Sequence, residues 1–133
     1  THQANIEDRL EAYKVLANKP YVTSIYRPNI FDFDNYIDNI YHHKFVICPE
    51  GNGIDCHRNW ESLYMDTIPI MKRNINTTYY EDLPICFIEN WNQVTEEFLN
   101  KEYDRIINTE WNLDKAYFEY WRDRIKSYTQ NNL

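Results

Sequence analysis

The residues best placed to do chemistry in this sequence are two glycines, Gly51 and Gly53, and the charged residues that follow them. These are the only glycines in a chain of 133 residues, and both lie in the loop 49–55, between the apolar run 45–48 and a segment with helical periodicity. Glycine is needed where the backbone has positive φ or where a ligand approaches bare backbone. The N-terminus of a helix also offers unpaired N–H groups to an anion. The loop is therefore a candidate anion-binding turn, and an ordinary tight turn is the alternative interpretation.

Arg58 and Glu61 lie on the helix expected after this loop, and because they are three residues apart they share one of its faces. A guanidinium one turn into the helix is within reach of a phosphate held by the loop, and a carboxylate one turn further on can accept hydrogen bonds from a ribose diol. Asn52 and Asp55 of the loop complete this candidate nucleotide-binding site. The alternative is a solvent-exposed ion pair between Arg58 and Glu61, which would contribute little energy.

Three further cationic side chains are secondary candidates for binding a phosphate. Lys72 and Arg73 directly follow the apolar run 68–71, and Arg9 lies in the first helical segment. Each of the three also fits an ordinary exposed surface charge.

Other catalytic chemistries find little support in the sequence. No G-x-S-x-G elbow surrounds any serine, so a hydrolase triad is not expected. Cys48 ends an apolar run, where cysteine is more often inert core than a nucleophile. We expect no metal and no other cofactor, since the histidines and cysteines lack C-x-x-C or H-x-x-x-H spacing: His42, His43, Cys48, Cys56 and His57.

Short apolar runs alternate with amphipathic segments along the chain, a pattern typical of an α/β fold with a parallel sheet. Parallel neighbours need crossover connections, so we expect a three-layer, Rossmann-like arrangement with helices on both faces of the sheet. Strands are expected at 21–26, 45–48, 68–71 and 85–88, helices at 6–17, 33–41, 55–64, 94–106 and 113–128, and a long loop with one helical turn at 72–82.

Helical periodicity also predicts which faces are buried. Ile6, Leu10, Tyr13 and Ala17 recur at helical spacing and are the expected inner face of the first helix. The last helix carries an aromatic stripe and is expected to pack across the layers formed before it.

Length, charge and cysteine content limit the remaining possibilities. A chain of 133 residues forms one domain, 1–133. Its formal charge of −7 opposes nucleic-acid binding, and no run approaches the roughly 18 apolar residues of a membrane span. Three cysteines without framework spacing, with no signal peptide ahead of them, favour a reducing cytoplasmic compartment. The chain begins with Thr1 rather than Met, so we expect an N-terminal part to be missing.

Residues 45–91, about a third of the chain, resemble a known family. The resemblance is to the C-terminal, nucleotide-sugar-binding half of exostosin-like glycosyltransferases of the GT-B fold. It is carried by FVICPEGNGID at 45–55, by Arg58, Trp60-Glu61, Leu63 and Ile68-Pro69-Ile70, and by Tyr80, Leu83-Pro84-Ile85 and Glu89-Asn90-Trp91. The family usually has glycine where Asp66 stands, and Asp tolerates the left-handed conformation better than most residues.

The resemblance implies that this chain is the donor-binding domain of a glycosyltransferase and binds a nucleoside diphosphate sugar without a metal. It implies that Arg58 faces the diphosphate, that Glu61 faces the ribose, and that residues 1–3 end a truncated first strand. The expected partner is a missing N-terminal acceptor domain. Without that domain we expect no sugar transfer, and we expect self-association through exposed apolar edges. The alternative is a noncatalytic nucleotide-binding or protein-interaction domain with a Rossmann-like fold.

Overall fold

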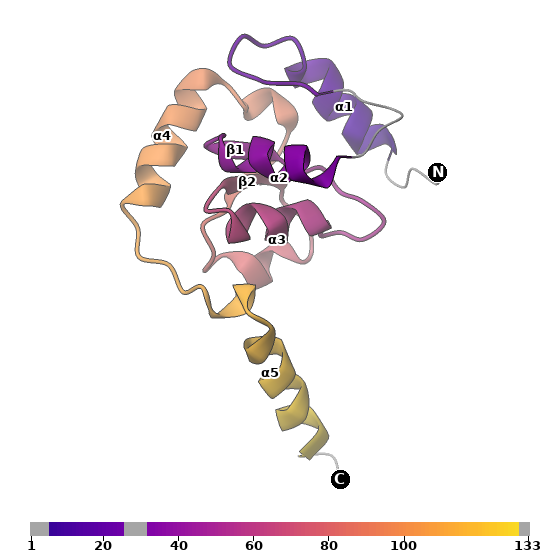
Figure 1. Cartoon of the computed structure of the whole chain (residues 1–133), viewed down its shortest axis with the longest axis vertical. Helices are drawn as coiled ribbons and strands as arrows, with labels where there is room; N and C mark the ends of the chain where they lie inside the picture. Colours follow the sequence, from indigo (N-terminus) through magenta and orange to yellow (C-terminus); the bar gives the residue numbers. More distant parts are fainter. Residues whose placement is uncertain (1–5, 26–31, 131–133) are drawn as a thin grey trace.

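The computed structural model describes residues 6–25 and 32–130 (Figure 1), so the strand expected to end at residues 1–3 lies outside the described residues. The sheet consists of β1 (Phe45–Ile47), β2 (Ile68–Lys72) and β3 (Cys86–Ile88). The helices are α1 (Ile6–Leu16), α2 (Phe33–Tyr41), α3 (His57–Tyr64), α4 (Glu96–Ile107) and α5 (Phe118–Gln130), with single 3₁₀ turns η1 (Thr77–Tyr80), η2 (Trp91–Gln93) and η3 (Asp114–Ala116).

The three strands form a parallel sheet in the order β1-β2-β3, with Phe45 opposite Ile68 and Ile70 opposite Cys86. The α3 helix follows β1 in the chain and leads to β2, as a parallel connection requires. The expected α/β class with a parallel sheet is therefore confirmed. The expected helical turn within 72–82 is also confirmed, by η1.

Side chains of the sheet belong to two buried clusters. Ile68 and Ile70 of β2 pack in one cluster with Leu16 of α1 and Ile106 of α4. Met71, the next residue along β2, belongs to a second cluster, because successive residues of a strand point to opposite faces of its sheet. That second cluster also contains Cys48, Tyr80, Leu83 and Ile85, with Val46, Cys56, Trp60, Leu63, Phe87 and Trp121 packed against it.

Side-chain hydrogen bonds mark where two of the helices, α2 and α4, begin. Asp32 caps α2 by accepting a hydrogen bond from the Asn35 N–H at 3.2 Å. Thr95 caps α4 in the same way, with its hydroxyl oxygen 3.2 Å from the Phe98 nitrogen. These caps satisfy N–H groups that have no partner within their own helix.

No helix in 6–25 or 32–130 combines the length and the apolar character needed to cross a bilayer.

The strand expected at 21–26 is not formed over its described part, since Tyr21 lies in a turn and residues 22–25 are irregular. The segment is held instead by side chains: the Tyr21 hydroxyl donates to the Val94 carbonyl at 3.0 Å, and Thr23 hydrogen-bonds His43 at 3.1 Å. β-branched and aromatic residues favour a strand only where a neighbouring strand pairs with them. Tyr26 lies outside the described residues.

The face predicted for α1 was wrong. Ile6, Leu10 and Tyr13 are 45%, 48% and 56% exposed, while Ala12 and Leu16 are buried against the sheet. The helix is rotated so that its acidic residues, not this apolar stripe, lie over the ends of the strands.

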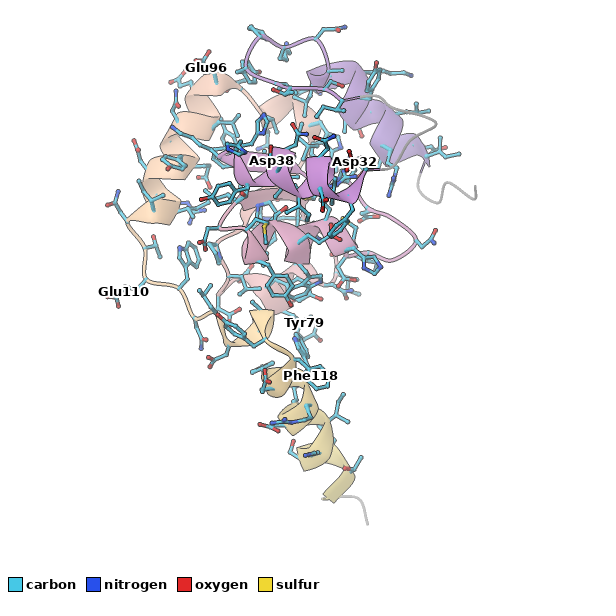
Figure 2. All side chains as sticks on the ribbon, in the orientation of Figure 1. Asp32, Asp38, Tyr79, Glu96, Glu110 and Phe118 are labelled. Atoms are coloured by element: carbon cyan, nitrogen blue, oxygen red, sulfur yellow. The ribbon has the colours of Figure 1, made fainter. Side chains whose placement is uncertain are left out.

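The packing predicted for the last helix was also wrong, because α5 extends away from the rest of the molecule (Figure 1). Phe118 is 73% exposed and Ile125 63%. Near its N-terminal end α5 is joined to the body by Trp121, which packs against the second cluster and whose indole N–H donates to the Lys115 carbonyl at 2.8 Å. Lys115, in the preceding η3 turn, contacts Asp82 at 2.9 Å. Figure 2 shows Phe118 and Tyr79 near the point where α5 leaves the body. An aromatic stripe predicts that a helix has an apolar face but does not say what covers it.

The α3 helix ends in a Schellman motif with Asp66 in the left-handed conformation, at φ 54°. The Thr67 N–H donates to the Ser62 carbonyl at 2.9 Å, and the Asp66 N–H donates to the Leu63 carbonyl at 3.3 Å. The expectation that Asp66 accommodates this turn is confirmed.

Because glycine adopts this conformation without steric cost, Asp66→Gly should raise the free energy of unfolding by about 0.5 kcal/mol. Urea denaturation followed by circular dichroism measures the change. Asp66→Ala is the matched control and should destabilise the protein, since alanine has neither the freedom of glycine nor the local hydrogen bonding of aspartate. A loss of stability in Asp66→Gly would contradict the prediction.

Candidate functional site

The candidate site lies at the carboxyl ends of the three parallel strands. Glu50 follows β1, Lys72 ends β2, and Trp91 follows β3. The first turns of α1 lie across these strand ends, where Asp8 contacts residues from all three connections. Ligands of open parallel sheets bind at this edge, and the glycine loop lies there because it directly follows β1.

Asp8 holds α1 against this edge. Its carboxylate accepts hydrogen bonds from the Trp91 indole N–H at 2.9 Å, the Lys72 ammonium at 3.0 Å and the Glu50 backbone N–H at 3.2 Å. Burial acts to raise the pKa of Asp8, but these hydrogen bonds and the charge of Lys72 outweigh it and lower the pKa below its ordinary value of 3.8. Asp8 therefore stays ionised and acts as the polar anchor of α1.

The glycine loop does not use positive φ, since among the residues described here only Asp66 has it. Of the two alternatives that the sequence offered for Gly51 and Gly53, positive φ was therefore wrong. A Cβ at Gly51 would lie 3.3 Å from the Arg9 guanidinium and 3.5 Å from the Cys56 Cβ, and one at Gly53 would lie 3.1 Å from the Asp55 carbonyl oxygen. Close approach by the protein's own backbone therefore accounts for Gly53, whereas the space beside Gly51 is bounded by the flexible end of Arg9 and by an ordinary contact with Cys56.

Arg9 and Asn74 fix the position of the loop. The Arg9 guanidinium donates to the Glu50 carbonyl at 3.1 Å, which brings this cation from α1 to the loop. The Asn74 amide, just beyond β2, donates to the Glu50 carboxylate at 3.1 Å and to the Ile54 carbonyl at 3.3 Å. The loop is thus tied to α1 and to the segment after β2, and Arg9 places a positive charge beside it.

Arg58 and Glu61 meet through a residue that the sequence did not predict, Tyr36 of α2. The Tyr36 hydroxyl donates to the Glu61 carboxylate at 2.5 Å and is also hydrogen-bonded to Arg58. Burial and the bond to Glu61 raise the pKa of Tyr36 to about 12. Arg58 further donates to the Ile47 carbonyl at 3.2 Å, at the end of β1. The two side chains share a helix face as expected, and Tyr36 joins them.

Arg58 keeps its charge although it is mostly buried. Burial acts to lower its pKa, but contacts with Tyr36, Cys48 and Cys56 outweigh burial and raise the pKa above its ordinary value. A permanently charged guanidinium beside a glycine loop is suited to a phosphate or another anion.

Of the other predicted site residues, Asp55, Lys72 and Arg73 have partners within the protein. Asp55 accepts hydrogen bonds from the Trp60 indole N–H and the Tyr80 hydroxyl, each at 3.4 Å, and Asn52 is exposed. Lys72 lies 3.0 Å from Asp8 and 2.9 Å from Glu11. Arg73 lies 3.3 Å from both Glu81 and Glu89, and its guanidinium stacks over Phe87. Of the four predicted cations, the structure brings Arg9 and Arg58 to the loop and pairs Lys72 and Arg73 with carboxylates.

Beside α1 lies an open depression of about 510 Å³. It is lined by Ile6, Glu7, Asp8, Glu11, Glu50 and Lys72. Four carboxylates against one ammonium make this depression unfavourable for a phosphate. In the described residues, no group of three or more His, Cys, Asp or Glu side chains is placed to hold a metal ion.

Sequence reasoning missed Tyr36, Asp8 and Asn74. Each reaches the site from a part of the chain far from the glycine loop, and no short motif marks any of them. No protein-family model matches this sequence, and no curated protein is significantly similar to it. The function of this chain must therefore be inferred from the geometry of the site.

Proposed function

We propose that this chain is the donor-binding domain of a glycosyltransferase and that it holds a nucleoside diphosphate sugar at the carboxyl end of β1. The observation that carries the proposal is the set of groups around one loop. Arg9 contacts the loop at the Glu50 carbonyl, Arg58 lies at the Ile47 carbonyl just before it, and Glu61 lies on the same face of α3 as Arg58. Two cations beside bare backbone suit a diphosphate, and a neighbouring carboxylate suits a ribose diol.

Each group has a distinct role in this proposal. Arg58 and Arg9 bind the diphosphate and stabilise the negative charge that develops on it when the bond to the sugar breaks. Glu61 accepts hydrogen bonds from the ribose hydroxyls, and Tyr36 orients both Arg58 and Glu61. The arginines supply the positive charge, so the proposed binding needs no metal ion.

The resemblance to exostosin-like enzymes extends the proposal to a three-layer, Rossmann-like half of a GT-B fold. The two buried clusters support it, because one joins the sheet to α1 and α4 and the other joins it to α3. A GT-B enzyme closes its site between two domains, so this chain alone should bind the donor without transferring the sugar.

Calorimetric titration of the chain with a panel of nucleoside diphosphates and the matching nucleosides tests the proposal. At least one diphosphate should bind more tightly than its nucleoside. Glu61→Gln should weaken both by roughly tenfold, since both ligands carry the ribose diol and a bond to a charged acceptor is lost. The matched control is Glu110→Gln, at an exposed glutamate in the loop after α4 (Figure 2), which should change neither affinity. No affinity for any diphosphate would overturn the proposal.

A noncatalytic protein-interaction domain is the second candidate, and exposed apolar surface favours it. Ile6, Leu10 and Tyr13 form one such stripe on α1, and Phe118 and Ile125 lie on the projecting α5. Surface of this kind marks interaction sites in soluble proteins. Concentration-dependent self-association in sedimentation, together with no nucleotide affinity in the titration above, would favour this candidate over the first.

A further inference from the structure

The α5 helix carries an exposed apolar face along its length. Phe118, Ile125 and Tyr128 are 73%, 63% and 60% exposed. Together with Trp121 they are spaced three, four and three residues apart, which is the spacing by which one helix packs along another. Trp121 packs against the second cluster, whereas the helix beyond it extends away from the body (Figure 1). We call these four residues the apolar face of α5.

Two arginines border the apolar face of α5, one on each side. By helical periodicity Arg122 lies along one border and Arg124 along the other. The acidic residues of the helix, Glu119 and Asp123, lie on the opposite face. Arg122 is 2.9 Å from Asp123, but an ion pair at such an exposed position contributes little and leaves the guanidinium accessible. A partner that fits this face is apolar along one row and negatively charged beside it.

The α2 helix has such a surface. Phe33, Ile37 and Tyr41 recur every four residues, and Phe33 and Tyr41 are 55% and 64% exposed. We call these three residues the apolar row of α2. Asp34 and Asp38 lie along one border of this row and are both exposed (Figure 2). The helix contains no lysine or arginine, so the border is negatively charged.

The other exposed apolar stripe, on α1, is a poorer match. Arg9 and Lys14 border it as well as Glu7, so two cations would face the arginines of α5. On α2 the nearest basic group is the imidazole of His42, which is 3.3 Å from Asp38 and leaves the aspartate side chain 70% exposed. Charge complementarity therefore favours α2 over α1.

We propose that α5 of one copy of this chain packs along α2 of a second copy, with the apolar face of α5 on the apolar row of α2 and its two arginines beside Asp34 and Asp38. In each copy α5 extends away from its own α2, so the contact joins different copies (Figure 1). Because every copy has both surfaces, exchange of α5 between two copies makes two equivalent contacts. The net charge of −7 disfavours an anionic lipid surface as the alternative partner of α5.

Sedimentation of the whole chain over a range of concentrations tests the proposal, and two charge-reversed double variants locate the contact. Arg122→Glu with Arg124→Glu, and separately Asp34→Arg with Asp38→Arg, should each weaken association more than about tenfold, because like charges then face each other. An equimolar mixture of the two double variants should associate like the parent, since opposite charges face each other again. A parent that stays monomeric up to about 1 mM, or a mixture no more associated than its components, would overturn the proposal.

Lys14→Glu with Lys101→Glu is the matched control. It makes the same change in net charge as the double arginine variant, at two exposed lysines outside both surfaces, and should associate like the parent. Far-ultraviolet circular dichroism checks that each variant is folded. An equal loss of association in this control would mean that net charge alone determines association, and would overturn the proposal.

Two further outcomes concern other partners and the nucleotide. Monomeric parent protein that binds vesicles containing phosphatidylserine would assign the apolar face of α5 to a lipid surface and overturn the proposal. The contact does not use Arg9, Arg58 or Glu61, so the α5 variants should keep the parent's affinity for nucleoside diphosphates. This proposal and the proposed function can therefore fail separately.

Discussion

Replacing Trp91 with alanine should lower the free energy of unfolding by about 3–5 kcal/mol, the range for removing a large aromatic side chain from a core. Trp91 is fully buried beside β3 and packs in the cluster that contains Leu16 and Ile106. Its indole N–H also donates to Asp8 at 2.9 Å, so the substitution removes both a core side chain and an anchor of α1. Urea denaturation followed by far-ultraviolet circular dichroism measures the loss.

Two further variants distinguish packing from the hydrogen bond. Trp91→Phe keeps much of the apolar volume but leaves Asp8 without one of its three donors, so its cost should be smaller than that of alanine. Phe118→Ala is the control for losing an aromatic ring, since Phe118 is 73% exposed and its replacement should leave stability nearly unchanged. Equal losses in Trp91→Ala and Phe118→Ala would contradict the assigned core.

The same contacts predict an effect of pH. The pKa of Asp8 is lower in the folded protein than its ordinary value of 3.8. A depressed pKa contributes stability that is fully present above pH 3.8 and is lost as the pH falls through the folded value. In Trp91→Phe the pKa of Asp8 should be less depressed, because burial remains while one favourable hydrogen bond is gone. The variant should therefore lose less stability on acidification than the parent.

The strands were predictable from the sequence because each is a continuous apolar run. The expected runs at 45–48, 68–71 and 85–88 agree with β1, β2 and β3 to within about a residue at each end. A strand in a parallel sheet that is covered on both faces must be apolar on both faces. A short, continuous apolar run is therefore typical of such a strand. The segment 21–26 has β-forming residues of the same types but does not pair with the sheet over its described part.

The orientation of the helices could not be predicted in the same way. In α1 the stripe Ile6, Leu10 and Tyr13 has the periodicity of a buried face, yet Ala12 and Leu16 are the buried residues. The rotation is determined by Asp8, whose partners Lys72 and Trp91 lie far along the chain. Periodicity describes one helix at a time, whereas these polar contacts join segments that only the fold brings together.

The residues of the candidate site also fall into two groups: those found from local sequence patterns, and those that only the fold brings together. The glycine loop was found because Gly51 and Gly53 are the only glycines, and the Arg58 and Glu61 spacing followed from helical geometry. Of the two reasons given for the glycines, positive φ was wrong, and no sequence pattern shows that the Asp55 carbonyl leaves little room for a side chain at Gly53. Tyr36 was missed because it lies on another helix, α2, and no sequence pattern links it to Arg58 or Glu61.

Arg58→Ala should weaken the binding of a nucleoside diphosphate by about 1.5–3 kcal/mol, or roughly ten- to 150-fold, the range for a hydrogen bond to a charged group. Binding of the matching nucleoside should change little, since it carries no phosphate. Calorimetric titration of parent and variant with both ligands measures the difference. Arg105→Ala is the matched control, because it removes the same charge from α4, where Arg105 pairs with Glu102.

The comparison of the two ligands makes the Arg58 result interpretable even if the variant is less stable. Arg58 donates to the Ile47 carbonyl and bonds Tyr36, so its truncation should also lower the free energy of unfolding. A general loosening of the site would weaken the diphosphate and the nucleoside together, as Glu61→Gln should, whereas loss of a phosphate contact weakens only the diphosphate. Unchanged diphosphate affinity in a folded Arg58→Ala variant would mean that Arg58 serves to join β1 to α2. The glycine loop would then be a tight turn, and the protein-interaction candidate would be the better account of this domain.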